Sequence, residues 1–257
     1  MQTPASAIPT HRSGRDREAR KELPEHVENQ FVHISRLAHL LSDSPDQHRA
    51  QKVIHGLTHG FDIGYRAQIQ QIFRKNNKSA LENRALVSKA IMKEVERGHT
   101  AGPFPQPPFD ICHVSPLGAA PKGDGSIRLI MDLSQPEGHS INDSISKDEF
   151  PTQYVHFDVA TEYIMAMGRG CLLCKVDIKH AYRLLPVRPE DWPLLVYFWE
   201  GSYFVDLKLP FGGRSSSSIF TDFADLVCWI ATTKHKLILI HYSDDYSFSL
   251  SPPYPLP

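Results

Sequence analysis

The sequence has little of what defines several classes of protein. It contains only four cysteines in 257 residues, too few for the disulfide scaffold of a small secreted protein. No run approaches the ~18 apolar residues that a membrane span needs, and the polar N-terminal residues include no secretory apolar core. We therefore expect an intracellular protein of the cytoplasm or nucleus that is not secreted and has no membrane partner.

The chain also has no excess of positive or of negative charge. The formal net charge is -1 at pH 7, so the chain as a whole has no electrostatic preference for a polyanion. Phosphates of nucleic acid are neutralised by Lys and Arg. A surface that binds nucleic acid must therefore be local.

Metal-binding patterns built on cysteine or histidine are incomplete. Cys171 and Cys174 have the spacing of a zinc-binding pair, but no second pair follows them. The 14 histidines form no two-ligand helical motif of the His-Glu-x-x-His kind. We expect both thiols to be buried in a strand.

Two neighbouring carboxylates, Asp244 and Asp245, stand between two apolar runs, 237–240 and 246–250. Adjacent side chains diverge on a regular strand, whereas at a tight turn both can approach one site. Neighbouring anions repel unless water or a cation screens them. The pattern therefore predicts a hairpin tip that presents metal ligands. Ordinary turn chemistry, which favours Ser and Asp for their local hydrogen bonds, is the alternative.

A third carboxylate, Asp177, ends the apolar run 171–178, which is typical of a short buried strand. A buried aspartate is costly unless it is paired or bound to metal. Mg²⁺ suits two oxygen-rich strand ends that lie side by side, and two such ions assist phosphoryl displacement. We expect the carboxyl groups of Asp177 and Asp244 to converge. A simple ion pair between Asp177 and Lys179 is the alternative.

Two further segments have clear turn or loop signals. Gly123-Asp124-Gly125 separates two extended stretches and predicts a hairpin that carries Lys122 near its tip and Arg128 on one strand. Pro210 and the following glycines predict a loop over 209–214, with Ser215 as the cap of the next helix. The apolar face of that helix is expected to comprise Ile219, Phe220, Phe223, Val227 and Ile230.

In their order and spacing, the motifs over residues 102–250 resemble the reverse transcriptase domain of retroelements. More loosely, Gly102 to Phe104, His113 to Gly118 and Pro186 to Trp192 resemble its DIRS-type retrotransposon branch. The matching segments are Lys122 to Arg128 with Asp132, Asp177 with Ala181 and Tyr182, Leu209 to Gly212, Ser216 to Phe220, and Tyr242 to Asp245. The resemblance implies an RNA-directed DNA polymerase. Such a nucleotidyltransferase uses two Mg²⁺ or Mn²⁺ ions, deoxynucleoside triphosphates, and an RNA or DNA template with a primer.

The resemblance also implies a role for each matching residue. The catalytic residues are Asp177, Asp244 and Asp245, and the metal ligands are Asp177, Ile178 and Asp244. The residues that bind the nucleotide are Lys122, Arg128, Tyr182, Phe211 and Gly212. Tyr182 is the aromatic gate beneath the sugar, which leaves no room for a 2′-hydroxyl. Ser217 departs from the family's pattern, because a proline usually follows the serine there.

The expected fold is α+β: reverse transcriptase fingers and palm, with an antiparallel palm sheet backed by helices and the thumb absent. Residues 1–26 are expected to be a disordered tail, 27–100 a helical region, 101–250 the fingers and palm, and 251–257 an irregular tail. The strand pair 194–199 and 203–207 is expected to join the sheet that contains the aspartates.

Two stretches before residue 100 are patterned as amphipathic helices. The first has apolar residues at helical spacing from Val27 to Leu41. The second opens at a capping box, Ser79 to Glu82, and closes at Gly98. Its apolar face is expected to comprise Leu81, Ala85, Ser88, Met92 and Val95.

Only twelve residues follow Asp245, which predicts a truncated or decayed retroelement reading frame. Two alternatives to a working polymerase follow. One is an inactive remnant that at most binds nucleic acid. The other is a two-metal nuclease of the RNase H kind, which also uses clustered carboxylates.

Overall fold

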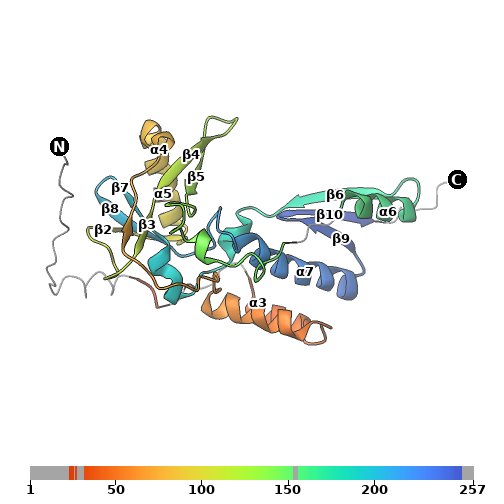
Figure 1. Ribbon diagram of the computed structural model, residues 1–257. Helices are drawn as coiled ribbons and strands as arrows, with labels where there is room; N and C mark the ends of the chain where they lie inside the picture. Colours follow the sequence, from red (N-terminus) through yellow and green to blue (C-terminus); the bar gives the residue numbers. More distant parts are fainter. Residues whose placement is uncertain (1–22, 26, 28–31, 153–155, 251–257) are drawn as a thin grey trace, which may run out of the picture.

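The computed structural model describes residues 23–25, 27, 32–152 and 156–250, and shows an elongated molecule with a β-sheet at each end (Figure 1). The predicted tail at 251–257, and all but residues 23–25 of the predicted tail at 1–26, lie outside the described residues. None of the described helices is both long and apolar enough to cross a membrane. The mixture of helices and largely antiparallel sheets confirms the α+β prediction.

The first sheet has five strands in the order β1-β3-β7-β8-β2. Their bounds are β1 Ile72–Phe73, β2 Thr100–Phe104, β3 His113–Ser115, β7 Val196–Trp199 and β8 Ser202–Asp206. The β7–β8 hairpin was predicted to join the sheet of the aspartates, and this prediction is wrong. Strand β2 pairs with β8 and strand β3 pairs with β7, so both edges of the hairpin are occupied by strands from earlier in the chain.

The second sheet has three antiparallel strands in the order β6-β10-β9. Their bounds are β6 Leu172–Asp177, β9 Ile238–Tyr242 and β10 Asp245–Leu250. Helix α7 (Ser216–His235) packs against β9, and helix α6 (Phe157–Met167) contacts β10 (Figure 1). Helices therefore back this sheet, as predicted for a palm.

The prediction that β6 is a buried strand is wrong. All six of its residues are exposed, with Leu172 and Leu173 at 53% and 60%. Cys174 is exposed and Cys171 is half-buried, so these are not buried thiols either. The physical reason is position: β6 is the outer strand, and α7 packs on β9 at the opposite edge of the sheet.

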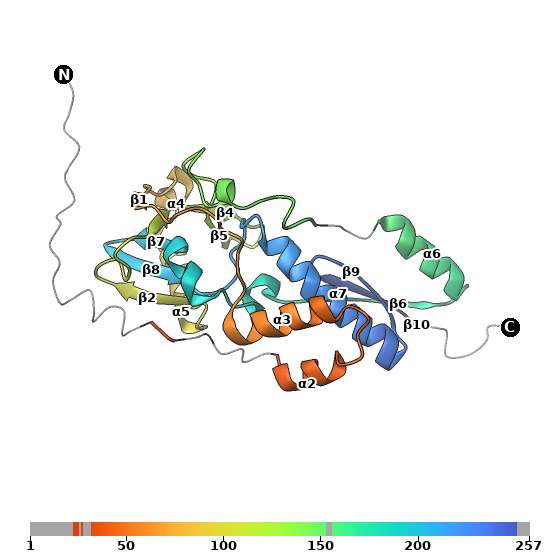
Figure 2. The same ribbon diagram turned by 60° about the horizontal axis from the view of Figure 1, so that its bottom comes forward.

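Four helices precede the first sheet's main strands: α2 Ile34–Leu40, α3 Gln47–His59, α4 Lys78–Glu82 and α5 Arg84–Glu96. Helix α3 runs beside α7 in both views (Figures 1 and 2). Two ion pairs join the helices, Arg49 to Asp225 at 2.7 Å and Lys52 to Asp222 at 2.9 Å. The region 27–100 therefore contains a strand as well as helices. It contributes β1 to the five-stranded sheet, and its helix α3 docks on α7.

The capping box predicted at residues 79–82 is wrong. Asn77 is the N-cap of α4, and the Ser79 hydroxyl instead accepts the N–H of Ala119 at 3.1 Å. The apolar face was also misplaced, since Leu81 and Met92 are 44% and 45% exposed. Helix α5 packs on β2 and β5 through a different face, whose buried residues are Val87 and Ile91.

Three other local predictions are confirmed. Strands β4 (Leu117–Pro121) and β5 (Ile127–Met131) form the predicted hairpin. Residues 209–214 form a loop before α7, and Ser215 is the N-cap residue, although its side chain makes no capping bond. The buried face of α7 includes Ile219, Phe220, Phe223 and Ile230.

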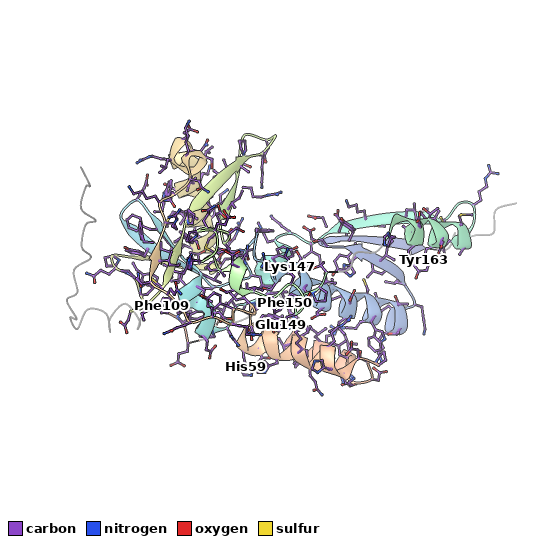
Figure 3. The ribbon with its side chains drawn as sticks, viewed as in Figure 1. His59, Phe109, Lys147, Glu149, Phe150 and Tyr163 are labelled. Carbon is purple, nitrogen blue, oxygen red and sulfur yellow. The ribbon has the colours of Figure 1, made fainter. Side chains whose placement is uncertain are left out.

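A long segment connects β5 to α6 and so joins the two ends of the molecule. Its Phe150 is buried (Figure 3), and it packs so closely on Gly64 that a Cβ there would lie 2.0 Å from the Phe150 ring. Nearby, Arg66 forms ion pairs with Glu149 and with Asp62. Tyr163 lies farther along, on α6 (Figure 3), and is 40% exposed.

Candidate functional site

Strand pairing places the predicted aspartates at one end of the three-stranded sheet. Asp177 ends β6, and its partner on β10 is Asp245. The turn between β9 and β10 is Ser243-Asp244, and the Ile178 N–H donates to the Asp244 carbonyl at 3.0 Å. Ser243 has a φ of 55°, a left-handed conformation uncommon for a residue other than glycine. Ladder pairing therefore places Asp177 beside the hairpin tip that carries Asp244.

A lysine that the sequence analysis did not consider completes this cluster. The ammonium of Lys175 lies 2.9 Å from the Asp245 carboxylate. Its hydrogen bond to Asp245, together with the charges of Asp245, Asp177 and Asp244, raises the pKa of Lys175. Among the described residues, no ion pair joins Lys179 to Asp177. The lysine partner is thus Lys175, and it binds Asp245 rather than Asp177.

The donor atoms at this point suit a hard cation. Asp177 and Asp244 offer carboxylate oxygens and Ile178 a backbone carbonyl, but among the described residues no three His, Cys, Asp or Glu side chains lie together as a group that could hold a metal ion. Mg²⁺ takes few carboxylates and completes its shell with water and substrate oxygens. A site with few protein ligands is therefore compatible with the residues present.

A single cleft of about 780 Å³ contains most of the predicted site. Predicted residues in its wall are Lys122, Arg128, Asp177, Ile178, Phe211 and Asp244. The β4–β5 hairpin supplies the two cations and the three-stranded sheet supplies the carboxylates. Tyr182, Gly212 and Asp245 are not in this wall.

Tyr182 lies directly behind the cleft. Its ring centroid is 5.3 Å from that of Phe211, which is 41% exposed, and 5.3 Å from that of the buried Phe220. Its hydroxyl is hydrogen-bonded to that of Ser217 at 3.0 Å. Gly212 has a φ of 94°, which glycine adopts without strain. Its carbonyl accepts a bond from the Asn142 amide at 2.9 Å.

Helix α5 adds a row of cations that the sequence analysis missed. Lys89, Lys93 and Arg97 all line the cleft. They are four residues apart, a spacing that places side chains on one face of a helix. In the sequence, this four-residue spacing of basic residues was the signal from which the row could have been predicted. With Lys122 and Arg128, these residues make one wall of the cleft basic in a chain whose net charge is close to zero.

An ion network of Glu94, Arg183 and Asp206 also lines the cleft. The Arg183 guanidinium contacts the Asp206 carboxylate at 2.7 Å and the Glu94 carboxylate at 3.0 Å. Burial alone would raise the pKa of Glu94, but the hydrogen bond from His99 and the charge of Arg183 hold it at about 2. Arg183 follows Tyr182 in the 3-10 helix η2 (Ala181–Leu184). The network therefore fixes the backbone that carries Tyr182.

Comparison with known proteins shows which solved structures share this architecture. No protein-family model matches the sequence. The crystal structure of prototype foamy virus protease-reverse transcriptase matches with a TM-score of 0.54 at 19% identity, over 86% of this chain and 30% of that chain. The chain has a reverse transcriptase-like fold. A foamy viral protease-reverse transcriptase in complex with double-stranded DNA matches with a TM-score of 0.51 at 16% identity, over 86% of this chain and 39% of that one.

The sequence is also similar to that of a curated protein. The Pro-Pol polyprotein of simian foamy virus type 1 is 24% identical over 132 residues, which are 51% of this chain and 11% of the polyprotein. This chain therefore spans only a small part of the relative's length. The reverse transcriptase-like domain predicted from the motifs agrees with these similarities.

Proposed function

We propose that this chain is the fingers and palm of an RNA-directed DNA polymerase from a retroelement of the retrotransposon kind. One observation carries the proposal: a single cleft is lined both by Asp177 at the end of β6 and Asp244 in the β9–β10 turn, and by the basic hairpin residues Lys122 and Arg128. These groups come from segments far apart in the sequence. Phosphoryl transfer from a nucleoside triphosphate needs both kinds of group at one place.

Each group has a role in the proposed reaction. Arg128 offers planar donors and Lys122 a point charge for the triphosphate of the incoming deoxynucleotide. Phe211, with Tyr182 behind it, supports the sugar and base. Asp177, Asp244 and the Ile178 carbonyl would hold Mg²⁺ or Mn²⁺, two ions in all. Bound there, the metal would assist deprotonation of the primer 3′-hydroxyl and stabilise charge on the displaced pyrophosphate.

Template and primer would lie along the basic wall. Lys89, Lys93 and Arg97 face the same cleft as the carboxylates, and rows of cations neutralise backbone phosphates without reading sequence. Asp245 is bound to Lys175. In this proposal, the Asp245 carboxylate neutralises the Lys175 ammonium beside the carboxylate ligands Asp177 and Asp244.

The direct test is extension of a DNA primer on an RNA template with deoxynucleotides and Mg²⁺ or Mn²⁺. Asp244→Asn should lower the rate at least about 100-fold, because the variant loses a carboxylate that would hold the metal beside the reacting phosphate. Asp148→Asn is the matched control, since Asp148 is exposed and outside the cleft. Equal rates for Asp244→Asn and the unmodified chain would refute the proposal.

The same samples discriminate the alternatives. Filter binding of an RNA/DNA hybrid without any extension would favour an inactive remnant that at most binds nucleic acid. Hydrolysis of the RNA strand of the hybrid would favour a two-metal nuclease. The Lys122 and Arg128 hairpin disfavours the nuclease, because hydrolysis requires no triphosphate site.

A further inference from the structure

The hydroxyl of Tyr182 is held by a residue at the start of the neighbouring helix. Tyr182 and Ser217 share a hydrogen bond of 3.0 Å between their hydroxyl oxygens. Ser217 lies in the first turn of α7, directly after the loop that carries Phe211 and Gly212. The bond therefore joins η2 to the first turn of α7, beside that loop.

Every other part of Tyr182 is already constrained. Behind it, Arg183 is bound to Glu94 and Asp206, and its guanidinium also donates to the Leu209 carbonyl at 3.4 Å. The ring also contacts the rings of Phe211 and Phe220. These ring contacts are apolar and permit sliding, whereas a hydrogen bond prefers one distance and direction. Ser217 thus supplies the directional restraint on the ring.

We propose that Ser217 is a positioning residue that sets the enzyme's preference for deoxynucleotides over ribonucleotides by anchoring Tyr182. The assignment rests on the proposed polymerase function. Tyr182 does not line the cleft itself but contacts Phe211, which does, so a displaced Tyr182 ring would shift Phe211 toward or away from the sugar. Displacement by about 1 Å changes reactivity greatly. With the anchor, the ring stays behind Phe211 and the cleft keeps its shape.

Sequence supports a specific role for this serine. Ser217 is the position at which the chain departs from the proline of the resembled family. Proline has neither a hydroxyl nor a backbone N–H, so it could not hold Tyr182 in this way. The anchor is therefore a property of this chain's own sequence.

The test measures kcat/KM for a deoxynucleotide and for the matching ribonucleotide in primer extension. Ser217→Ala should lower the ratio of the two roughly three- to ten-fold, the range expected for one hydrogen bond, mainly by improving ribonucleotide use. Tyr182→Phe loses the same bond and should lower the ratio to a similar extent. The double variant should show no further fall, because both changes remove one interaction.

Two variants separate this role from a general effect on folding. Ser217→Thr keeps a hydroxyl and should retain most of the preference. Ser218→Ala removes the adjacent buried serine hydroxyl and should leave the ratio unchanged. If Ser217→Ala and Tyr182→Phe lower thermal stability by similar amounts without changing the ratio of deoxynucleotide to ribonucleotide use, the bond is only structural.

Three outcomes are distinguishable. The anchor is overturned if Ser217→Ala has the same ratio as the unmodified chain. It is also overturned if the effects of the two single variants multiply in the double variant. Either result leaves the polymerase proposal intact. Absence of extension by the unmodified chain refutes the polymerase proposal and takes the anchor with it. A shared, non-multiplying fall supports both.

Discussion

Lys175 and Asp245 form an ion pair across the β6–β10 ladder, with the ammonium nitrogen 2.9 Å from a carboxylate oxygen. The pair places a positive charge beside Asp177 and Asp244. The hydrogen bond to Asp245 and its charge, followed by the charges of Asp177 and Asp244, raise the pKa of Lys175. A resident ammonium competes with a metal cation for the same anionic environment. Lys175 therefore limits how strongly the proposed site attracts divalent ions.

Replacing Lys175 should strengthen cation binding. In Lys175→Met, we expect the dissociation constant for Mn²⁺ to fall roughly three-fold, because a neighbouring like charge at an exposed site is removed. Calorimetry or the electron paramagnetic resonance of free Mn²⁺ would measure it. Lys147→Met is the control, since Lys147 is exposed and lies on the segment that connects the two ends of the molecule (Figure 3). Unchanged affinity would argue against an ion at these carboxylates.

Removal of Arg183 should destabilise the fold strongly. Arg183→Met leaves the buried Asp206 carboxylate without its cation and removes one partner of the half-buried Glu94, and breaking a buried pair costs about 3–5 kcal/mol. Urea unfolding would measure the loss. Lys78→Met is the comparison, because its pair with Glu82 is 88% and 61% exposed and should be worth under about 1 kcal/mol. Similar losses for the two variants would contradict the assigned role of the network.

Lys208 should make stability depend on alkaline pH. Burial and the charge of Arg183 lower its pKa from 10.5 to about 8. Between those values the unfolded chain binds more protons than the folded one, so the contribution of Lys208 to stability rises with pH across that window. Below pH 8 the folded state bears the full cost of a buried ammonium.

Comparison with Lys208→Met isolates this effect from that of other titrating groups. The variant should gain stability relative to the unmodified chain at pH 7, and the gain should shrink by at most about 3 kcal/mol as the pH rises to 10.5. Chemical unfolding across that range provides the measurement. A difference that stays constant with pH would show that Lys208 keeps its ordinary pKa.

The cationic row on α5 should govern affinity for nucleic acid. Lys93→Ala should weaken binding of an RNA/DNA hybrid for all sequences alike and reduce the slope of log affinity against log salt by about 1. Lys89→Ala should do the same, because both side chains line the cleft. Fluorescence anisotropy at several salt concentrations would test this. Arg36→Ala, on α2 and outside the cleft, is the control; an equal slope change there would indicate non-specific attraction.

Features with a local signal were predictable from sequence. The turn residues around Asp124 and those at Ser243-Asp244 mark hairpins without reference to the rest of the chain. The helical spacing of Phe220, Phe223 and Ile230 predicted the buried face of α7, which the structure confirms. For the site itself, the order of short motifs selected six residues that line one cleft, while Tyr182, Gly212 and Asp245 lie outside its wall.

The sequence by itself determined the hairpins, the loop before α7 and six of the candidate residues that line the cleft, because each belongs to a short local pattern. Tertiary structure decided which sheet receives β7 and β8, the exposure of β6, the buried face of α5, and the contacts that Arg183 and Ser217 make. Those properties depend on which segments distant in sequence pack together. Burial and strand pairing are relations between segments, and an apolar run has the same letters whether or not another element covers it.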